Sequence, residues 1–148
     1  MITPTLLSIF DRELNRLKTE ILSYQSEENI WRIQGQILNS GGNLTLHLIG
    51  NLNTYIGLAL GKTGYERNRE EEFSLKNVPR HRLVSEIEDT AAMIHQTLLR
   101  LTEEDYRWEY PMLVFEKKTS TEYMLIHLAS HLSYHLGQIN YHRRLVEA

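Results

Sequence analysis

Apolar residues recur at steps of three and four along four long segments of the chain, which is the spacing of one face of an α-helix. The second segment also carries two polar residues, His47 and Asn51, at positions that belong to its apolar face. Amphipathic helices bury such faces most simply against one another, so the pattern predicts an all-α fold, a four-helix bundle forming one domain over residues 1–148. The four apolar faces are Leu6, Phe10, Leu14, Leu17 and Ile21; Leu44, Leu48, Leu52, Tyr55 and Leu58; Leu83, Ile87, Ala91, Ile94, Leu98 and Leu101; and Leu125, Leu128, Leu132, Leu136 and Ile139.

Residues that favour helix starts stand before several of these segments. Pro4 suits the first turn of a helix, where a missing N–H costs nothing. Ser40 and Asn43 are plausible N-caps for the second segment. Thr119 and Glu122 have the spacing of a capping box, which predicts a last helix running from about residue 119 to 144.

The aliphatic composition also favours helices, because the chain has 23 leucines and only 4 valines, and β-branched valine is the costlier of the two in a helix. Two longer connections remain, over residues 62–79 and 102–118. Neither is rich enough in glycine and serine to be a flexible linker. We expect ordered loops, the second with room for a short extended stretch.

With 148 residues, of which 41% are apolar and 24% charged, the chain has the size and composition of about one globular domain. The formal net charge is −3, so the basic excess that a dedicated nucleic-acid-binding protein uses against phosphates is absent. The amino-terminal residues lack the basic start and long apolar stretch of a signal peptide, and no run of about 18 apolar residues is present. We therefore expect a cytoplasmic protein with no nucleic-acid or membrane partner.

The chain has no cysteine, which removes disulfides, thiolate metal ligands and a cysteine nucleophile. Histidine is more informative: there are seven, and His127, His131 and His135 lie with Gln138 in a row beside the apolar face of the last helix. A buried imidazole costs free energy unless its nitrogens find partners. Two histidines one turn apart on a helix can bind a single metal ion, at about 2.0–2.1 Å for zinc.

One helix cannot supply all three of these histidines to one ion, because His127 and His135 are separated by about 12 Å along the axis. The pair is therefore either His127 with His131 or His131 with His135. A third ligand has to come from another helix, and His47 is the candidate. The alternatives are a hydrogen-bonded core histidine at position 47 and a solvated polar row on the last helix. Asn51, one turn after His47, is a candidate either for orienting that imidazole or for a residue of an interface.

Three segments of the sequence resemble a known family. Residues 131–139, HLSYHLGQI, resemble the HxxxHxGQI signature of the DinB/YfiT-like superfamily of metalloenzymes. Residues 42–52, GNLTLHLIGNL, resemble the histidine motif of its second helix. Residues 67–73, RNREEEF, are similar to a loop in an uncharacterised branch of the superfamily. The resemblance covers about residues 5–146.

The resemblance implies an up-down-down-up four-helix bundle, commonly a homodimer, in which three histidines hold a divalent metal ion. Carried onto this chain, the ligands are His47, His131 and His135, which leaves His127 as a neighbour. Characterised relatives are transferases and isomerases that depend on low-molecular-weight thiols such as bacillithiol or mycothiol, so a thiol cofactor and a small-molecule substrate are implied. Imidazole suits several transition metals, of which zinc and nickel are the ones we expect.

This chemistry is compatible with the residues themselves. Three histidines leave an open position on a divalent ion, and such an ion lowers the pKa of a bound water or thiol. A chain without cysteine fits an enzyme whose thiol arrives as a cofactor. Arg67 and Arg69 are the candidates for holding a carboxylate of that thiol or of its substrate.

Two other functions stay open, a metal-dependent hydrolase that uses bound water and a non-catalytic, metal-binding dimeric module. The hydrolase consumes no thiol, and the module predicts a fourth protein ligand that closes the metal site. A ferritin-like di-iron protein is excluded because no Glu-x-x-His motif occurs in the chain. A zincin protease is excluded because His-Glu-x-x-His is absent.

Overall fold

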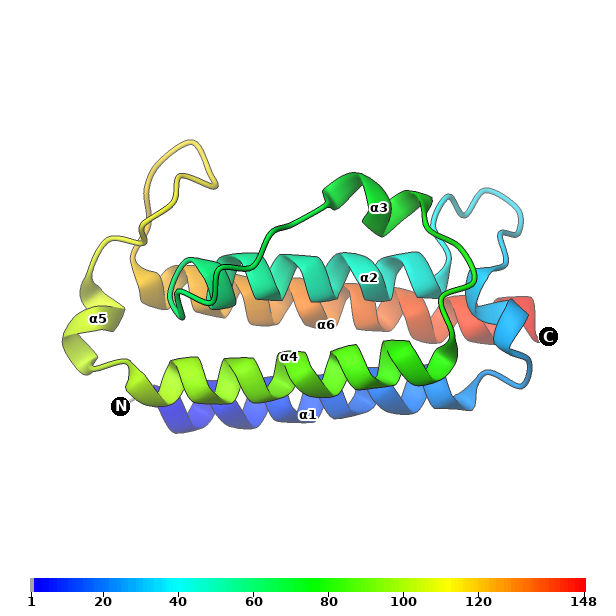
Figure 1. The fold of residues 1–148 in the computed structure, drawn as a ribbon, viewed down its shortest axis with the longest axis horizontal. Helices are drawn as coiled ribbons and strands as arrows, with labels where there is room; N and C mark the ends of the chain where they lie inside the picture. Colours follow the sequence, from blue (N-terminus) through cyan, green and yellow to red (C-terminus); the bar gives the residue numbers. More distant parts are fainter. Residues whose placement is uncertain (1) are drawn as a thin grey trace.

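The computed structural model describes residues 2–148, and this part of the chain is all-helical, as the apolar pattern predicted (Figure 1). Within it the structure has no strand, although Glu109 and Ser120 form an isolated antiparallel bridge. The longer helices are α1 (Thr3–Ser23), α2 (Gly41–Leu52) with its π-helical continuation η2 (Asn53–Leu58), α4 (Arg80–Arg100) and α6 (Thr121–Val146). The short helices are the 3₁₀ helix η1 (Glu27–Trp31), α3 (Arg69–Ser74) and α5 (Glu103–Arg107).

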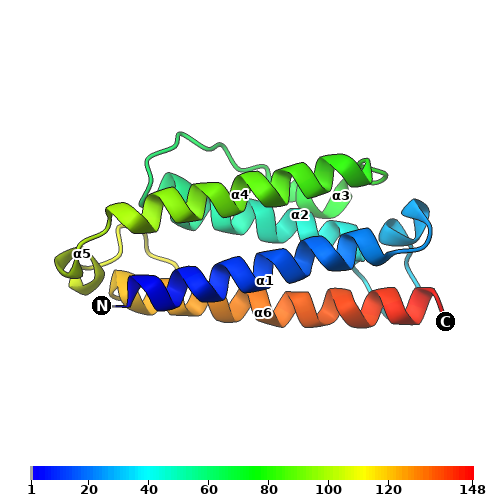
Figure 2. The ribbon, with the colours of Figure 1, turned by 90° about the horizontal axis from the view of Figure 1, so that it is seen from below.

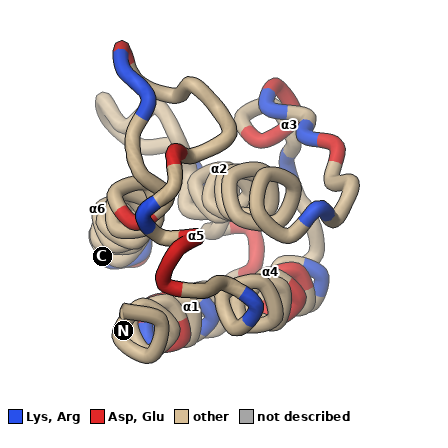
Figure 3. Tube along the Cα trace, turned by 90° about the vertical axis from the view of Figure 1, so that its left-hand side faces the viewer, with Lys and Arg blue, Asp and Glu red and all other residues tan. Residues whose placement is uncertain are grey.

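The longer helices pack side by side around a common interior. α1 packs against α4 and α6, and α2 packs against the same two helices. The view along the helices shows α1, α4, α2 and α6 at four corners (Figure 3), and the view from below shows α1 beside both α4 and α6 (Figure 2). α1 and α6 run in one direction, whereas α2 and α4 run in the other (Figure 1).

The predicted apolar faces supply most of the core. Every apolar residue of the first and fourth faces is buried, among them Phe10 and Leu132. The exception that matters is Leu58, which is 38% exposed although the pattern assigned it to the core. It lies at the end of η2, where Gly61 N–H donates to the Ile56 carbonyl in an i→i+5 bond of 2.9 Å. A π turn holds more residues than an α turn, so the later side chains rotate and the fully buried Ile56 points inward instead.

Of the two N-caps predicted for the second helix, Ser40 is right and Asn43 lies inside α2. The predicted start of the last helix is wrong by one residue. Ser40 Oγ accepts a hydrogen bond from Asn43 N–H at 3.1 Å. For α6 the N-cap is Ser120, whose Oγ accepts from Tyr123 N–H at 3.1 Å. Thr119 does not cap because its carbonyl accepts a 2.8 Å bond from Tyr110 N–H, which keeps it in the short extended pairing beside the bridge.

The two connections contain more regular structure than expected. The segment after η2 crosses back over the bundle, and its helix α3 lies over α2 (Figure 1). Asn43 holds it there, because its Nδ2 donates to the carbonyls of Glu72 and Leu75, at 2.9 Å each. Among residues 2–148 no helix is both long and apolar enough to cross a membrane.

Candidate metal centre

His47 on α2 and His131 and His135 on α6 converge on one point between the two helices. The Nε2 atom of His131 lies 3.4 Å from Nε2 of His47 and 3.1 Å from Nε2 of His135. One nitrogen from each of the three rings lies within 4.8 Å of the other two, a spacing that a single metal ion can bridge. His47 is buried, and the other two histidines are partly exposed.

The hydrogen bonds on the far side of two rings determine which nitrogen carries the hydrogen. His47 Nδ1 donates to Glu72 Oε1 at 3.1 Å, and His135 Nδ1 donates to Gln138 Oε1 at 2.7 Å. A neutral imidazole with its hydrogen on Nδ1 presents a lone pair at Nε2. Two lone pairs therefore face Nε2 of His131, which can place at most one hydrogen between them. A cation at this point satisfies all three nitrogens, so the donor set fits a divalent metal ion.

The same surroundings keep the imidazoles of His131 and His135 neutral. Burial, helped by the nearby rings of His135 and His47, lowers the pKa of His131 to about 4. Burial also lowers the pKa of His135, although the hydrogen bond with Gln138 opposes the shift. Both rings are then neutral near pH 7, which is the form that binds a metal.

His127 lies outside this group, one turn before His131. Its ring packs edge-on against Phe115 at 4.8 Å between ring centroids, and lies 6.2 Å from the ring of His131. Of the two pairs that the sequence left open, the structure brings together His131 with His135. Among the other histidines, His142 is buried in the core, where its ring nitrogens contact Tyr24 Oη and the Arg32 carbonyl, each at 2.7 Å. His81 and His95 are exposed on α4.

Glu72 is the residue at this site that the sequence did not single out. It stands in a run of charged residues, which is usually a solvated segment, yet it is buried in the structure. Burial raises the pKa of Glu72, but hydrogen bonds from His47 and Arg67 outweigh this and leave the pKa below its ordinary value. The carboxylate is therefore charged beside the site. Asn51 was a candidate partner of His47, but its buried Oδ1 has no hydrogen-bond partner among the described residues.

Arg67 and Arg69 lie next to the site at different depths. Arg67 donates Nε to Glu72 Oε2 at 2.8 Å and Nη2 to Glu72 Oε1 at 2.9 Å. Arg69 is exposed, with its guanidinium 5.5 Å from the ring centroid of Phe73, and that ring lies 5.1 Å from the ring of His47. Two donors of Arg67 are thus occupied by a carboxylate of the protein itself, and the binding of an external carboxylate by this pair stays a prediction.

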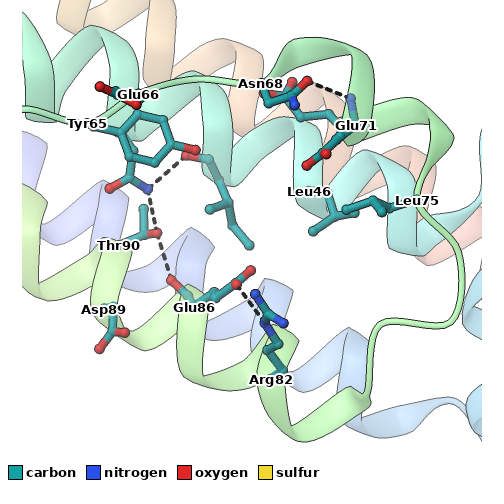
Figure 4. Close-up of a pocket in the computed structure, with 13 residues that line it drawn as sticks. Leu46, Tyr65, Glu66, Asn68, Glu71, Leu75, Arg82, Glu86, Asp89 and Thr90 are labelled. Atoms are coloured by element: carbon teal, nitrogen blue, oxygen red, sulfur yellow. Dashed lines mark hydrogen bonds and ion pairs between the residues drawn. The ribbon is translucent and has the colours of Figure 1, made fainter.

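A cavity of about 360 Å³ adjoins Glu72 on the side of α4. Figure 4 shows its carboxylates, with Glu86 paired to Arg82 at 3.3 Å. Glu66, Glu71 and Asp89 also line it, whereas none of the three clustered histidines does. The excess of carboxylates disfavours an anionic ligand there.

The comparisons with other proteins agree with the fold. Among solved structures, the chain is similar to the crystal structure of a conserved protein from Enterococcus faecalis, with a TM-score of 0.79 and 16% sequence identity. That similarity covers 99% of this chain and 97% of the other, and at such low identity it shows the fold alone. No curated protein matches the chain. Residues 7–148 match the model of a family described as a protein of unknown function, DUF1572, and the chain therefore belongs to the DUF1572 family.

Proposed function

We propose that this protein is a divalent-metal-dependent enzyme of the DinB/YfiT-like superfamily, with an up-down-down-up bundle and with His47, His131 and His135 as its metal ligands. The observation that carries the proposal is the convergence of three Nε2 atoms, two of which present lone pairs. The sequence motifs around residues 42–52 and 131–139 support the same assignment. Zinc and nickel are the ions that we expect.

The size of the ligand set favours catalysis over a purely structural role. Structural zinc sites are usually closed by four protein ligands, whereas catalytic sites keep three and leave one position open. In the described part of the chain, the cluster that can hold an ion consists of three histidines. The partly exposed rings of His131 and His135 allow a small molecule to approach it.

The chain supplies ligands and charges but no thiol, because it has no cysteine. A divalent ion held by the histidines lowers the pKa of a bound thiol or water and so supplies a nucleophile near neutral pH. We propose that the thiol is a low-molecular-weight cofactor, which the enzyme transfers to an electrophilic small molecule. In this scheme Arg69 is the more available of the two arginines for a carboxylate of the incoming thiol, because it is exposed.

Hydrolysis by metal-bound water is the second candidate, because the same open site serves water as well as a thiol. The experiment that decides begins with elemental analysis of untagged protein. A set of electrophilic substrates is then offered with and without a low-molecular-weight thiol. Product that forms only with the thiol supports the transferase, whereas thiol-independent turnover supports the hydrolase. A metal content far below one ion per chain would count against both.

A further inference from the structure

Gly50 lies on α2 about one turn after His47, and the carboxylate of Glu72 packs directly against it. A Cβ at position 50 would come within 2.6 Å of the Glu72 carboxyl carbon and closer still to Oε2. Real Cβ atoms do not approach neighbours so closely, so the carboxylate and a side chain at position 50 cannot both occupy this place. The glycine therefore provides the space that the carboxylate fills.

Contacts from three directions hold the carboxylate against Gly50. Arg67 donates two hydrogen bonds, one to each carboxylate oxygen, at 2.8 and 2.9 Å. Asn43 donates to the main-chain carbonyl of Glu72 at 2.9 Å and so fixes the backbone of α3 over α2. The side chain of Glu72 is only 6% exposed and that of Arg67 15%, so water competes little for these bonds. The remaining contact of Oε1 is the 3.1 Å bond with His47 Nδ1.

We propose that Glu72, packed against Gly50 and held by Arg67, is a positioning residue that fixes the tautomer and the ring orientation of His47. The inference rests on the proposed function, because it gives His47 the role of a metal ligand. A charged acceptor at Nδ1 keeps the hydrogen there, leaves the lone pair on Nε2 and makes that nitrogen a better ligand. Arg67 then acts on the metal site through Glu72.

The three proposed ligands differ in the hydrogen-bond partner of Nδ1, so the role of Glu72 applies to His47 alone. His135 has a neutral partner, Gln138, which is exposed and therefore exchanges readily with water. The buried Nδ1 of His131 has no hydrogen-bond partner among the described residues. Only His47 has a buried, charged partner. We expect loss of this partner to weaken metal binding more than loss of Gln138.

The test is Gly50→Ala with Gly137→Ala as its matched control. Both glycines lie within helices that carry ligands, so alanine raises helix propensity at both positions. A Cβ at Gly137 would meet nothing within 4 Å. In a competitive zinc titration, Gly50→Ala should raise the Kd by roughly 10–100-fold, the usual cost of losing such a partner. Gly137→Ala should leave the Kd within about twofold of wild type.

A double-mutant cycle shows whether the effect passes through Glu72. In the Glu72→Ala background the carboxylate is gone, so Gly50→Ala should cost no further zinc affinity. In parallel, ¹⁵N NMR of the His47 ring in metal-free protein reports the tautomer. We expect the hydrogen on Nδ1 in wild type and a shift toward Nε2 in Gly50→Ala and in Glu72→Ala.

The outcomes separate this inference from the proposed function. If wild type binds zinc and Gly50→Ala binds it equally well, the positioning role is wrong and the metal site stands. The same conclusion follows if Gly50→Ala costs as much affinity without Glu72 as with it. If wild type binds no metal ion, the proposed function fails. The ring tautomer then decides the positioning role by itself: an unchanged tautomer in Gly50→Ala overturns it.

Discussion

The Nε2 atoms of His131 and His135 lie 3.1 Å apart on successive turns of α6. His127, one turn earlier on the same helix, turns its ring to Phe115 instead. The row of imidazoles that looks uniform in the sequence is thus divided into a facing pair and a neighbour. This division can be tested residue by residue.

His135→Ala should cost far more zinc affinity than His127→Ala, and His131→Ala should be at least as damaging as His135→Ala. Losing a ligand removes a coordinate bond, whereas losing a neighbouring group typically costs only about 10–100-fold. The measurement is a competitive zinc titration of the three variants at one fixed pH. Tight binding by His135→Ala together with no binding by His127→Ala would move the site by one helical turn.

The helical fold could be predicted from the sequence because the spacing of apolar residues along the chain shows which positions of each helix are buried. The core positions of α1 and α6 follow the 3.6-residue repeat throughout. Leu58 fails because the π turn of η2 changes that repeat. One backbone carbonyl of this segment, that of Tyr55, accepts a 2.6 Å hydrogen bond from the hydroxyl of Tyr110. That contact joins distant parts of the chain, so no local pattern could indicate it.

The cluster of three histidines that could hold a metal ion could be predicted in part for the same reason. The spacing of His131 and His135 is local, but the choice between that pair and His127 with His131 needed either the family resemblance or the structure. Glu72 could not be found, because its burial depends on α3 folding back over α2 and on the space at Gly50. A charged run has the same appearance whether it is solvated or enclosed.

The unfolding free energy of the metal-free protein should fall as pH decreases below about 6.5, partly because of His142. The unfolded chain binds a proton there near the ordinary histidine pKa of about 6.5, whereas burial lowers the folded pKa despite the opposing effects of the Arg32 carbonyl and Glu147. More protons are then bound by the unfolded state between the two pKa values, so acid favours unfolding in that window.

Replacing His142 by Gln removes this titration, so stability should depend less steeply on pH below about 6.5. It should also cost about 1–3 kcal/mol at pH 7, because buried partners of the imidazole are left unpaired. Urea unfolding with a chelator present measures both effects. Some slope should remain, since the pKa values of His131 and His135 are lowered in the same direction. Parallel curves for wild type and the variant would contradict the assignment.

Thiol transfer should be abolished by His47→Ala, while the helix content stays close to that of wild type. The substitution removes the ligand that α2 supplies, but the apolar residues around it still form the core. His95→Ala is the matched control, because this histidine is exposed on α4 and has no proposed role. Rates are measured with a low-molecular-weight thiol and an electrophile, and helix content by circular dichroism. Equal rates in wild type and His47→Ala would instead favour a binding module.

We expect the protein to form a symmetric homodimer, which is the commonest oligomer among soluble proteins and is common in the family that the sequence resembles. Sedimentation at micromolar concentration should give about twice the chain mass of 17.4 kDa. The measurement should be repeated after the metal ion has been removed, because the non-catalytic module predicts that the ion stabilises the dimer. A single monomeric species under both conditions would contradict the expected homodimer.

Zinc or nickel should raise the Tm of the metal-free protein, because an ion that binds only the folded state stabilises it by mass action. At 100 times the Kd this amounts to about 2.7 kcal/mol, or a rise of roughly 5–10 °C for a chain of this size.

Since burial lowers the pKa of His131 to about 4 and lowers that of His135 as well, these two ligands stay neutral below the ordinary histidine range. The rise in Tm should nevertheless shrink as the pH falls, because the ion needs all three imidazoles and protonated imidazole cannot bind it. Thermal unfolding with and without added metal, at several pH values, measures this directly. The variant His131→Ala should show no such rise at any pH, and a full rise in that variant would place the ion elsewhere.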